Sequence, residues 1–213
     1  MSHFLNDDQK AIRDVAAKFA VNELMPIANE IDASESTPDW VVKRCAELGF
    51  YGITIAEEFG GIGAGLVTAC VVLEEIAKAS PAFAGLLSVQ MILCPATVAL
   101  LGTPEQKARL LPASASGVRV MAYSQTEPAG VGNIAYHQTR LRPDGNGYRL
   151  DGHKLFCTQG TAKTYLVMPR TQRDGQDGYG CVIVEAEDEG FEVQKYEHKL
   201  GWRGTNTGPI AFN

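Results

Sequence analysis

Hydrophobic and polar residues follow two different periods along the chain. In the first half, apolar residues recur at every third or fourth position, and Ile12, Val15, Ala16 and Phe19 show the spacing of one helix face. After about residue 117, apolar and β-branched residues alternate with polar ones in short runs, a pattern typical of strands. The sequence therefore predicts a helical region followed by a β region.

Capping residues locate the predicted helices. Asn6 followed by Gln9 predicts a capping box, and Pro38 and Gly49 are typical of the first turn and the end of a second helix. Five helices are expected: from Asn6, from Pro38, over 66–79, over about 84–101, and from Thr103 through TPEQKARLL. A glycine-rich stretch, GGIGAG at 60–65, lacks the G-x-G-x-x-G spacing and a surrounding strand–helix–strand unit. It is predicted to be an interhelix loop.

Six runs predict strands in the second half: RVMAYSQT, YHQTRLR, GYRLDGHKLFCT, TYLVMPRT, GCVIVEAE and GFEVQKYEHK. Turn signals such as PDGNG and RDGQDG separate them. Six or seven strands joined by short turns predict a small antiparallel barrel or sandwich. The expected fold class is α+β, with an N-terminal α-helical domain over 1–117 and a β domain over 118–213.

Charge and hydropathy exclude some classes of function. The net charge of −6 argues against nucleic-acid binding, which usually requires a basic face. Residues 79–102 carry no charge and could cross a bilayer by length alone. Pro81, Pro95 and several polar residues interrupt this stretch, and no basic cluster flanks it. A buried core helix is expected there, and no membrane span.

Cysteine and histidine usage favours a reducing environment without a metal. The five cysteines are scattered without a C-x-x-C pair, and the polar start does not resemble a signal peptide. We therefore expect a cytoplasmic protein. The four histidines show no ligand spacing; His137 and His153 are expected on strands in surface or hydrogen-bonded roles.

Two predicted strands end in similar polar clusters. MAYSQTEPAGVGN at 121–133 runs from apolar residues into Ser124, Gln125 and Thr126, and then into a proline and glycines. LFCTQG at 155–160 does the same at Thr158. Such ends could hold a flat heteroaromatic ring, because proline and glycine leave backbone N–H groups for a ligand. Ordinary strand ends with hydroxyl-capped turns remain the alternative.

These stretches resemble the acyl-CoA dehydrogenase family over nearly the whole chain. LLGTPEQKARLLPASASGVRVMAYSQTEPAGVGN resembles the family's GTxEQKxxYLPxLASGxxxxxxxxTEPxAGSD. LDGHKLFCTQGTAKTYLV resembles xNGxKxWITNGxxAxxxxV, and HKLGWRGTNTGPIAF resembles xKLGxRxSxTxxxxF. The loop GITIAEEFGGIGAG is similar to the one before the family's third helix.

The resemblance implies FAD as cofactor and α,β-dehydrogenation of an acyl-CoA thioester. It places Tyr123, Gln125 and Thr126 at the flavin pyrimidine edge, Phe156 on one flavin face and Thr158 near N5. The cofactor-binding residues that it implies are Tyr123, Ser124, Gln125, Thr126, Gly132, Phe156, Cys157 and Thr158. The substrate-binding residues are Gly132, Leu86 and Val89, the last two as an apolar floor of the acyl pocket.

The sequence departs from the family pattern at three of these positions. The chain has AGVG where the family has GAGS, so Gly132 takes the place of a serine that helps to hold phosphate or substrate in the family. Phe156 replaces the usual tryptophan, and Gln159 the usual asparagine. An aromatic ring is retained at 156, without the indole N–H. The acyl group that the protein would accept is not identified.

The resemblance implies that the catalytic glutamate is not among these 213 residues. In the family a C-terminal four-helix domain carries that base, further FAD contacts and the tetramer interface, and Glu127 does not match the base. The chain alone is expected to bind FAD poorly and not to catalyse. Electron-transfer flavoprotein and a homo- or hetero-oligomer are the expected partners.

Several alternatives stay open. The chain is either a piece of a longer dehydrogenase or one subunit whose second chain carries the helical domain. A non-catalytic interaction module on a degenerate dehydrogenase scaffold is a third reading, since one fold hosts many functions. An acyl-CoA oxidase or a flavin monooxygenase of the same fold is a fourth.

Overall fold

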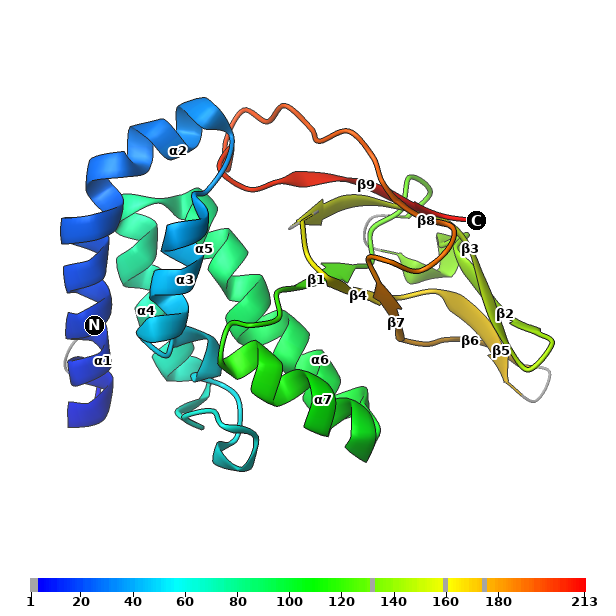
Figure 1. Cartoon of the computed structure of the whole chain (residues 1–213), viewed down its shortest axis with the longest axis horizontal. Helices are drawn as coiled ribbons and strands as arrows, with labels where there is room; N and C mark the ends of the chain where they lie inside the picture. The colour runs from blue at the N-terminus through cyan, green and yellow to red at the C-terminus, as the bar shows by residue number, and fades with distance from the viewer. Residues whose placement is uncertain (1–3, 131–132, 159–160, 174–175) are drawn as a thin grey trace. The chain divides into compact units, whose positions relative to one another are not determined.

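The chain divides into two compact units in the computed structural model, which describes residues 4–130, 133–158, 161–173 and 176–213 (Figure 1). The helical unit comprises Met1–Val120 with His198–Thr205, and the β unit Met121–Glu197 with Asn206–Asn213. The late segment 198–205 thus groups with the helices, which the alternation of residues did not indicate. The exact boundary at 117 stays a prediction.

The helical unit contains the expected helices and one that the sequence did not predict. The α-helices are α1 (Asp7–Phe19), α2 (Ala28–Ser34), α3 (Asp39–Glu47), α4 (Gly65–Ala79), α5 (Pro81–Ser88), α6 (Cys94–Leu101) and α7 (Pro104–Ala115). The predicted capping box forms at Asn6 with Gln9, and Thr103, where a helix was expected to start, forms a second capping box with Gln106. The unpredicted α2 has no side-chain cap. The single helix expected over about 84–101 begins at Pro81 and is divided into α5 and α6 by a π-helical turn, Val89–Leu93.

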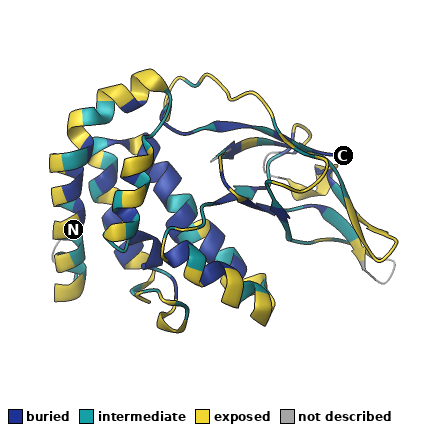
Figure 2. Ribbon diagram, in the orientation of Figure 1, coloured by how far each residue is buried: buried dark blue, intermediate teal, exposed yellow. Residues whose placement is uncertain are grey.

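Buried apolar residues, several of them four positions apart, build the core of the helical unit. Figure 2 shows these buried turns in dark blue. Phe83, Leu87 and Met91 are completely buried, as are Val72 and Ile76 of α4. The run Pro81–Leu101 is long and apolar enough to span a membrane, and half of its most apolar window is buried inside this unit. That burial agrees with the expected core helix.

The glycine-rich stretch is an interhelix loop that packs on the chain just before it. The amides of Ile62, Gly63 and Ala64 donate to the carbonyl oxygens of residues 52, 55 and 53, at 2.8–2.9 Å. Because these N–H groups are used inside the loop, they are not available to cradle a phosphate. A Cβ atom at Gly61 would overlap the carbonyl oxygen of Ile55.

Segment 198–205 is held against the end of α2. Arg203 Nη2 lies 2.7 Å from Glu35 Oε1, and His198 Nδ1 lies 2.9 Å from the other oxygen of the same carboxylate. Thr37 donates to the carbonyl oxygen of Gly204 at 2.9 Å. These contacts explain why the segment groups with the helices.

The β unit contains two mixed sheets. Its strands are β1 (Met121–Ser124), β2 (Arg140–Asp144), β3 (Gly147–Thr158), β4 (Thr164–Val167), β5 (Arg170–Arg173), β6 (Gln176–Tyr179), β7 (Val182–Glu185), β8 (Phe191–Val193) and β9 (Thr207–Phe212). The sheet orders are β1-β4-β7 and β6-β5-β2-β3-β9-β8. The predicted α+β class is confirmed, but the sheets are not purely antiparallel, because β1 pairs with β4 in parallel.

Some predicted strands have other limits in the structure. The run TYLVMPRT is divided into β4 and β5 around Pro169, which has no N–H for a ladder. The run YHQTRLR becomes a strand only at Arg140, so His137 precedes β2 instead of lying on a strand. Strands β6 and β9 were not predicted as separate strands, and β6 begins in the stretch RDGQDG that predicted a turn.

Replacing Gly61 with alanine tests the packing of the loop. We expect Gly61→Ala to lower the free energy of unfolding by about 1–3 kcal/mol, because backbone cannot move aside for the new methyl group. Gly178→Ala is the control, since no atom lies within 4 Å of a Cβ there. It should change stability by less than about 0.5 kcal/mol in urea unfolding. Equal losses of stability in the two variants would contradict the close packing of Gly61 against the backbone of Ile55.

Candidate cofactor site

A buried ion pair lies where β1 ends. Glu127 is three residues beyond β1, Lys154 is on β3, and their side chains are 2% and 0% exposed. Lys154 Nζ is 2.6 Å from Glu127 Oε1. Buried charges are tolerated only when they are paired and fully hydrogen-bonded.

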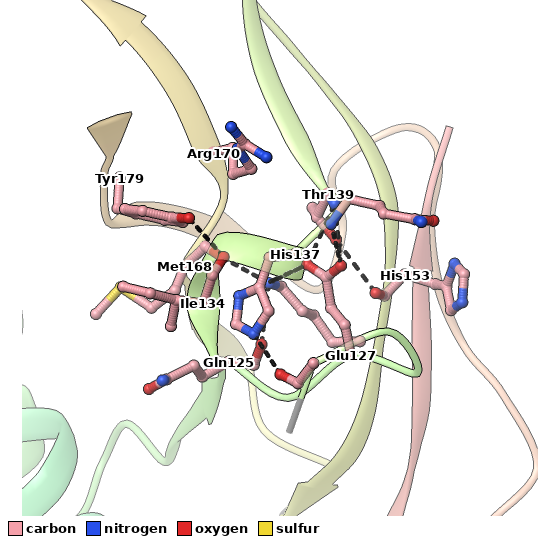
Figure 3. A network of polar contacts seen from close by, with 12 residues as sticks. Gln125, Glu127, Ile134, His137, Thr139, His153, Met168, Arg170 and Tyr179 are labelled. Atoms are coloured by element: carbon pink, nitrogen blue, oxygen red, sulfur yellow. Dashed lines mark hydrogen bonds and ion pairs between the residues drawn. The ribbon is translucent and has the colours of Figure 1, made fainter. Parts of the chain in front are cut away.

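The hydrogen bonds of this pair connect four segments of the β unit. Besides Glu127, Lys154 Nζ donates to the carbonyl oxygens of Gln125 at 3.1 Å and Met168 at 2.6 Å. All three ammonium hydrogens therefore have acceptors. Glu127 also accepts hydrogen bonds from the amides of Gln138 and Thr139, which lead into β2 (Figure 3). The pair thus fixes the ends of β1 and β4 against β3 and the start of β2.

The surroundings keep Glu127 ionised. Burial by itself favours the neutral carboxyl, but the hydrogen bonds from Lys154, Gln138 and Thr139 outweigh it and lower the pKa of Glu127. Burial lowers the pKa of Lys154, and Glu127 partly offsets that effect. A carboxylate in this arrangement is poorly suited to remove a proton from a substrate, because every donor around it stabilises the charged form.

His137 holds the turn that follows Glu127. Its ring is buried, and Nε2 lies 2.7 Å from the carbonyl oxygen of Gly130, so Nε2 carries the proton. The amide of Gly130 in turn donates to the carbonyl oxygen of Glu127 at 3.2 Å. His137 Nδ1 lies 4.0 Å from Glu127 Oε1 and has no hydrogen-bond partner among the described residues. The hydrogen-bonded role expected for His137 is found, in a buried position.

The predicted cofactor stretch uses its carbonyl groups inside the unit. Ser124 O accepts from Met168 N at 3.0 Å, and Thr126 O accepts from Leu155 N at 2.8 Å. The carbonyl of Gln125 accepts from Lys154. Tyr123 donates its hydroxyl to Gln125 Oε1 at 3.0 Å, which leaves the side-chain NH₂ of Gln125 as a donor. The groups that this stretch can offer to a ligand are therefore mainly donors.

Ser124 and Cys157 point into the β unit. Their side chains are buried and lie 3.0 Å apart, and burial raises the pKa of the Cys157 thiol to about 11. Only main-chain atoms of these two predicted cofactor residues remain for a ligand.

Phe156 points outward because β3 contains a bulge. The register with β9 shifts between Lys154 and Cys157, so both of these residues face inward although they are three positions apart. Phe156 has a φ of +54° and is 54% exposed. A non-glycine residue in the left-handed region is uncommon and costs about 1–3 kcal/mol. The strained bulge therefore presents an aromatic face beside the end of β1, to which Leu155 is hydrogen-bonded.

The other predicted site residues lie farther from the ion pair or outside the residues that the structure describes. Thr158 is half-buried at the end of β3. Leu86 is in the core of the helical unit, and Val89 is half-buried at the start of the π-helical turn. Gly132 and Gln159 lie outside the described residues. Among the described residues, no group of three His, Cys, Asp or Glu side chains is arranged to hold a metal.

Family models match both halves of the chain. The acyl-CoA dehydrogenase N-terminal domain matches residues 6–118, and the acyl-CoA dehydrogenase middle domain matches residues 122–213. The chain belongs to the acyl-CoA dehydrogenase family. The resemblance seen in the sequence is thereby confirmed for the family and the fold.

Individual acyl-CoA dehydrogenases support this assignment. Isobutyryl-CoA dehydrogenase of Dictyostelium discoideum is 33% identical over 98% of the chain and 50% of its own length. The short-chain-specific acyl-CoA dehydrogenase of Clostridium acetobutylicum is 34% identical over 100% of the chain and 56% of its own length. The chain therefore spans about half the length of these relatives.

Solved structures of family members share the fold of this chain. Butyryl-CoA dehydrogenase of Megasphaera elsdenii superimposes with a TM-score of 0.91 at 28% identity, over 98% of the chain and 56% of its own. Glutaryl-CoA dehydrogenase of Mycobacterium smegmatis, solved in complex with FADH2, gives 0.93 at 26% identity, over 100% of the chain and 54% of its own.

Removing the cation of the buried pair should destabilise the β unit. We expect Lys154→Met to lower the free energy of unfolding by about 3–5 kcal/mol, because it leaves the Glu127 carboxylate buried without its countercharge. Lys163→Met is the matched control, since the Lys163 side chain is 67% exposed. Urea unfolding followed by circular dichroism measures both variants. A loss no larger than that of the control would show that the pair does not support the fold.

The lowered pKa of Glu127 predicts an acid-dependent component of stability. Its folded pKa lies below the ordinary 4.5, so its contribution is present above pH 4.5 and is lost as the pH falls through the folded pKa. Glu127→Gln has no such titration. The gap in unfolding free energy between wild type and Glu127→Gln should therefore narrow between pH 6 and about pH 3. A constant difference in unfolding free energy over this pH range would contradict the lowered pKa of Glu127.

Proposed function

We propose that residues 1–213 supply part of the cofactor and acyl site of an FAD-dependent acyl-CoA dehydrogenase. The observation that carries the proposal is the pairing of two surfaces at the end of β1. One is a strand end whose remaining groups are mainly hydrogen-bond donors. The other is the half-exposed ring of Phe156, which the hydrogen bond from Leu155 N to Thr126 O holds beside that end.

This pairing suits a flat ring whose edge carries acceptors. The side-chain amide of Gln125 and the neighbouring groups of Tyr123 and Thr126 would face the pyrimidine edge of an isoalloxazine, and Phe156 would pack on one face. Thr158 would direct its hydroxyl toward N5. The chemistry that bound FAD would supply is the acceptance of a hydride at the N5 atom of its flavin ring. The flavin ligand named for the Mycobacterium smegmatis relative supports this choice of cofactor.

The proposed substrate is an acyl-CoA thioester, from which a carboxylate removes the α-proton. Relatives named for isobutyryl-CoA and short-chain acyl-CoA support this class. Leu86 and Val89 would form an apolar floor for the acyl chain. Glu127 is excluded as the base by its buried ion pair with Lys154. We propose that the base is supplied from outside residues 1–213, by further sequence of the same protein or by a partner chain.

The electron acceptor, assembly and location are further parts of the proposal. Electron-transfer flavoprotein is the proposed acceptor, and a chain in a structure named for that flavoprotein of Acidaminococcus fermentans matches with a TM-score of 0.93 at 32% identity, over 100% of this chain and 57% of its own. We propose a cytoplasmic oligomer.

A titration of FAD into the purified chain tests the cofactor surface. We expect weak binding, detected as quenching of flavin fluorescence, and a further loss of about 3- to 10-fold in Phe156→Leu because ring stacking is removed. Tyr148→Leu is the control, since that ring is on β3 and 71% exposed. Equal affinity of wild type and Phe156→Leu for FAD would show that Phe156 is not part of the flavin site. Flavin binding that depends on Phe156 would count against a non-catalytic interaction module.

An activity assay tests where the base lies. The purified 213-residue chain, loaded with FAD, should not oxidise butyryl-CoA or isobutyryl-CoA with a dye acceptor. Turnover by this chain alone would place a base within it and overturn this part of the proposal. Hydrogen peroxide formed in air would indicate an oxidase.

A further inference from the structure

Two arginines lie directly side by side on neighbouring strands of the six-stranded sheet. Arg140 of β2 and Arg170 of β5 are partners in the parallel register. Arg142 is two residues farther along β2 and so lies on the same face as Arg140. Like charges in register destabilise a sheet. Asp177 balances only part of this charge, because it is the one carboxylate beside three arginines among the described residues that line a pocket here.

The three arginines line one small open pocket. Its volume is about 290 Å³, and its lining includes Arg140, Arg142 and Arg170 with Asp177 as the one carboxylate among the described lining residues. Pockets for drug-sized molecules are usually about 300–1,000 Å³. This pocket therefore suits a small anion, or the charged end of a larger ligand.

The nearby carboxylates are already engaged by other groups. Asp177 accepts from Arg170 Nη2 at 2.9 Å and from Gln172 Nε2 at 2.9 Å. Asp151, the antiparallel partner of Arg140 on β3, lies 3.0 Å from Arg149 Nε and 3.6 Å from Arg142 Nη1. Arg140 itself makes no ion pair within 4.0 Å with any residue that the structure describes, although the hydrogen bond from Gln172 and the charge of Arg140 both help to lower the pKa of Asp177.

One of the three guanidinium groups is held in place before any ligand arrives. Arg170 Nη1 donates to the carbonyl oxygen of Ala135 at 3.2 Å, while Nη2 contacts Asp177. Its side chain is only 21% exposed. A fixed guanidinium loses little conformational freedom on binding, which favours recognition of an anion with several oxygens.

We propose that the pocket of Arg140, Arg142 and Arg170 binds a phosphate group. A phosphate carries a charge close to −2 and several acceptor oxygens, which match converging guanidinium forks better than a monovalent anion does. None of the pocket residues belongs to the predicted flavin or acyl set. The phosphate pocket is therefore independent of the proposed dehydrogenase function, and its failure would leave that function unaffected.

Isothermal titration of inorganic pyrophosphate and of adenosine 3′,5′-bisphosphate at about 0.15 M salt tests the pocket. Arg140→Gln should weaken binding by about tenfold or more, because it removes a charged donor. Lys163→Gln is the control that makes the same change in net charge at a position 67% exposed. Unchanged thermal unfolding of Arg140→Gln confirms that its fold is intact.

The two probes distinguish the source of the phosphate. Tighter binding of the nucleotide would indicate a nucleotide ligand, whereas equal affinities would indicate phosphate alone; either result, with the loss in Arg140→Gln, supports the pocket. Wild-type protein that binds neither probe would overturn the proposal. Equal weakening by Arg140→Gln and Lys163→Gln would also overturn it, since net charge alone would then explain binding.

Discussion

The β unit is organised around one buried ion pair, between Glu127 and Lys154. Its hydrogen bonds reach the ends of β1 and β4 and the residues that lead into β2. A charge can stay in such a place only when it is paired and hydrogen-bonded, as the ammonium group of Lys154 and the carboxylate of Glu127 are. The pair therefore fixes strand ends that are far apart in the sequence, and it anchors Glu127, Gln138 and Thr139 in the segment between β1 and β2.

The proposed cofactor surface follows from this constraint. Lys154 must face inward to reach Glu127, and Cys157 faces inward to reach Ser124. Inward positions three residues apart do not fit the alternation of a strand. The bulge that reconciles them turns Phe156 outward with a positive φ. The same anchoring uses the carbonyl groups of 124–126 and leaves donors for a ligand.

Much of the fold could be predicted from local signals, while the site depended on distant contacts. Asn6, Gln9 and Thr103 located helix starts because capping is decided within four residues. The parallel pairing of β1 with β4 could not be read in this way, since it joins residues about forty positions apart. Lys154 gave one signal that was missed, an ionisable residue in the middle of a strand. Its partner Glu127 lies 27 positions away, and His137 showed no pattern that linked it to Gly130.

Hydrogen–deuterium exchange of Lys154→Met against wild type tests most directly whether the ion pair organises the strand ends. Under conditions where the variant stays folded, we expect faster exchange at the amides of Gln138, Thr139, Leu155 and Met168. Exchange in helix α4 of the helical unit should not change. Uniformly faster exchange in both units, or unchanged protection at those four amides, would contradict the central role of the Glu127–Lys154 pair.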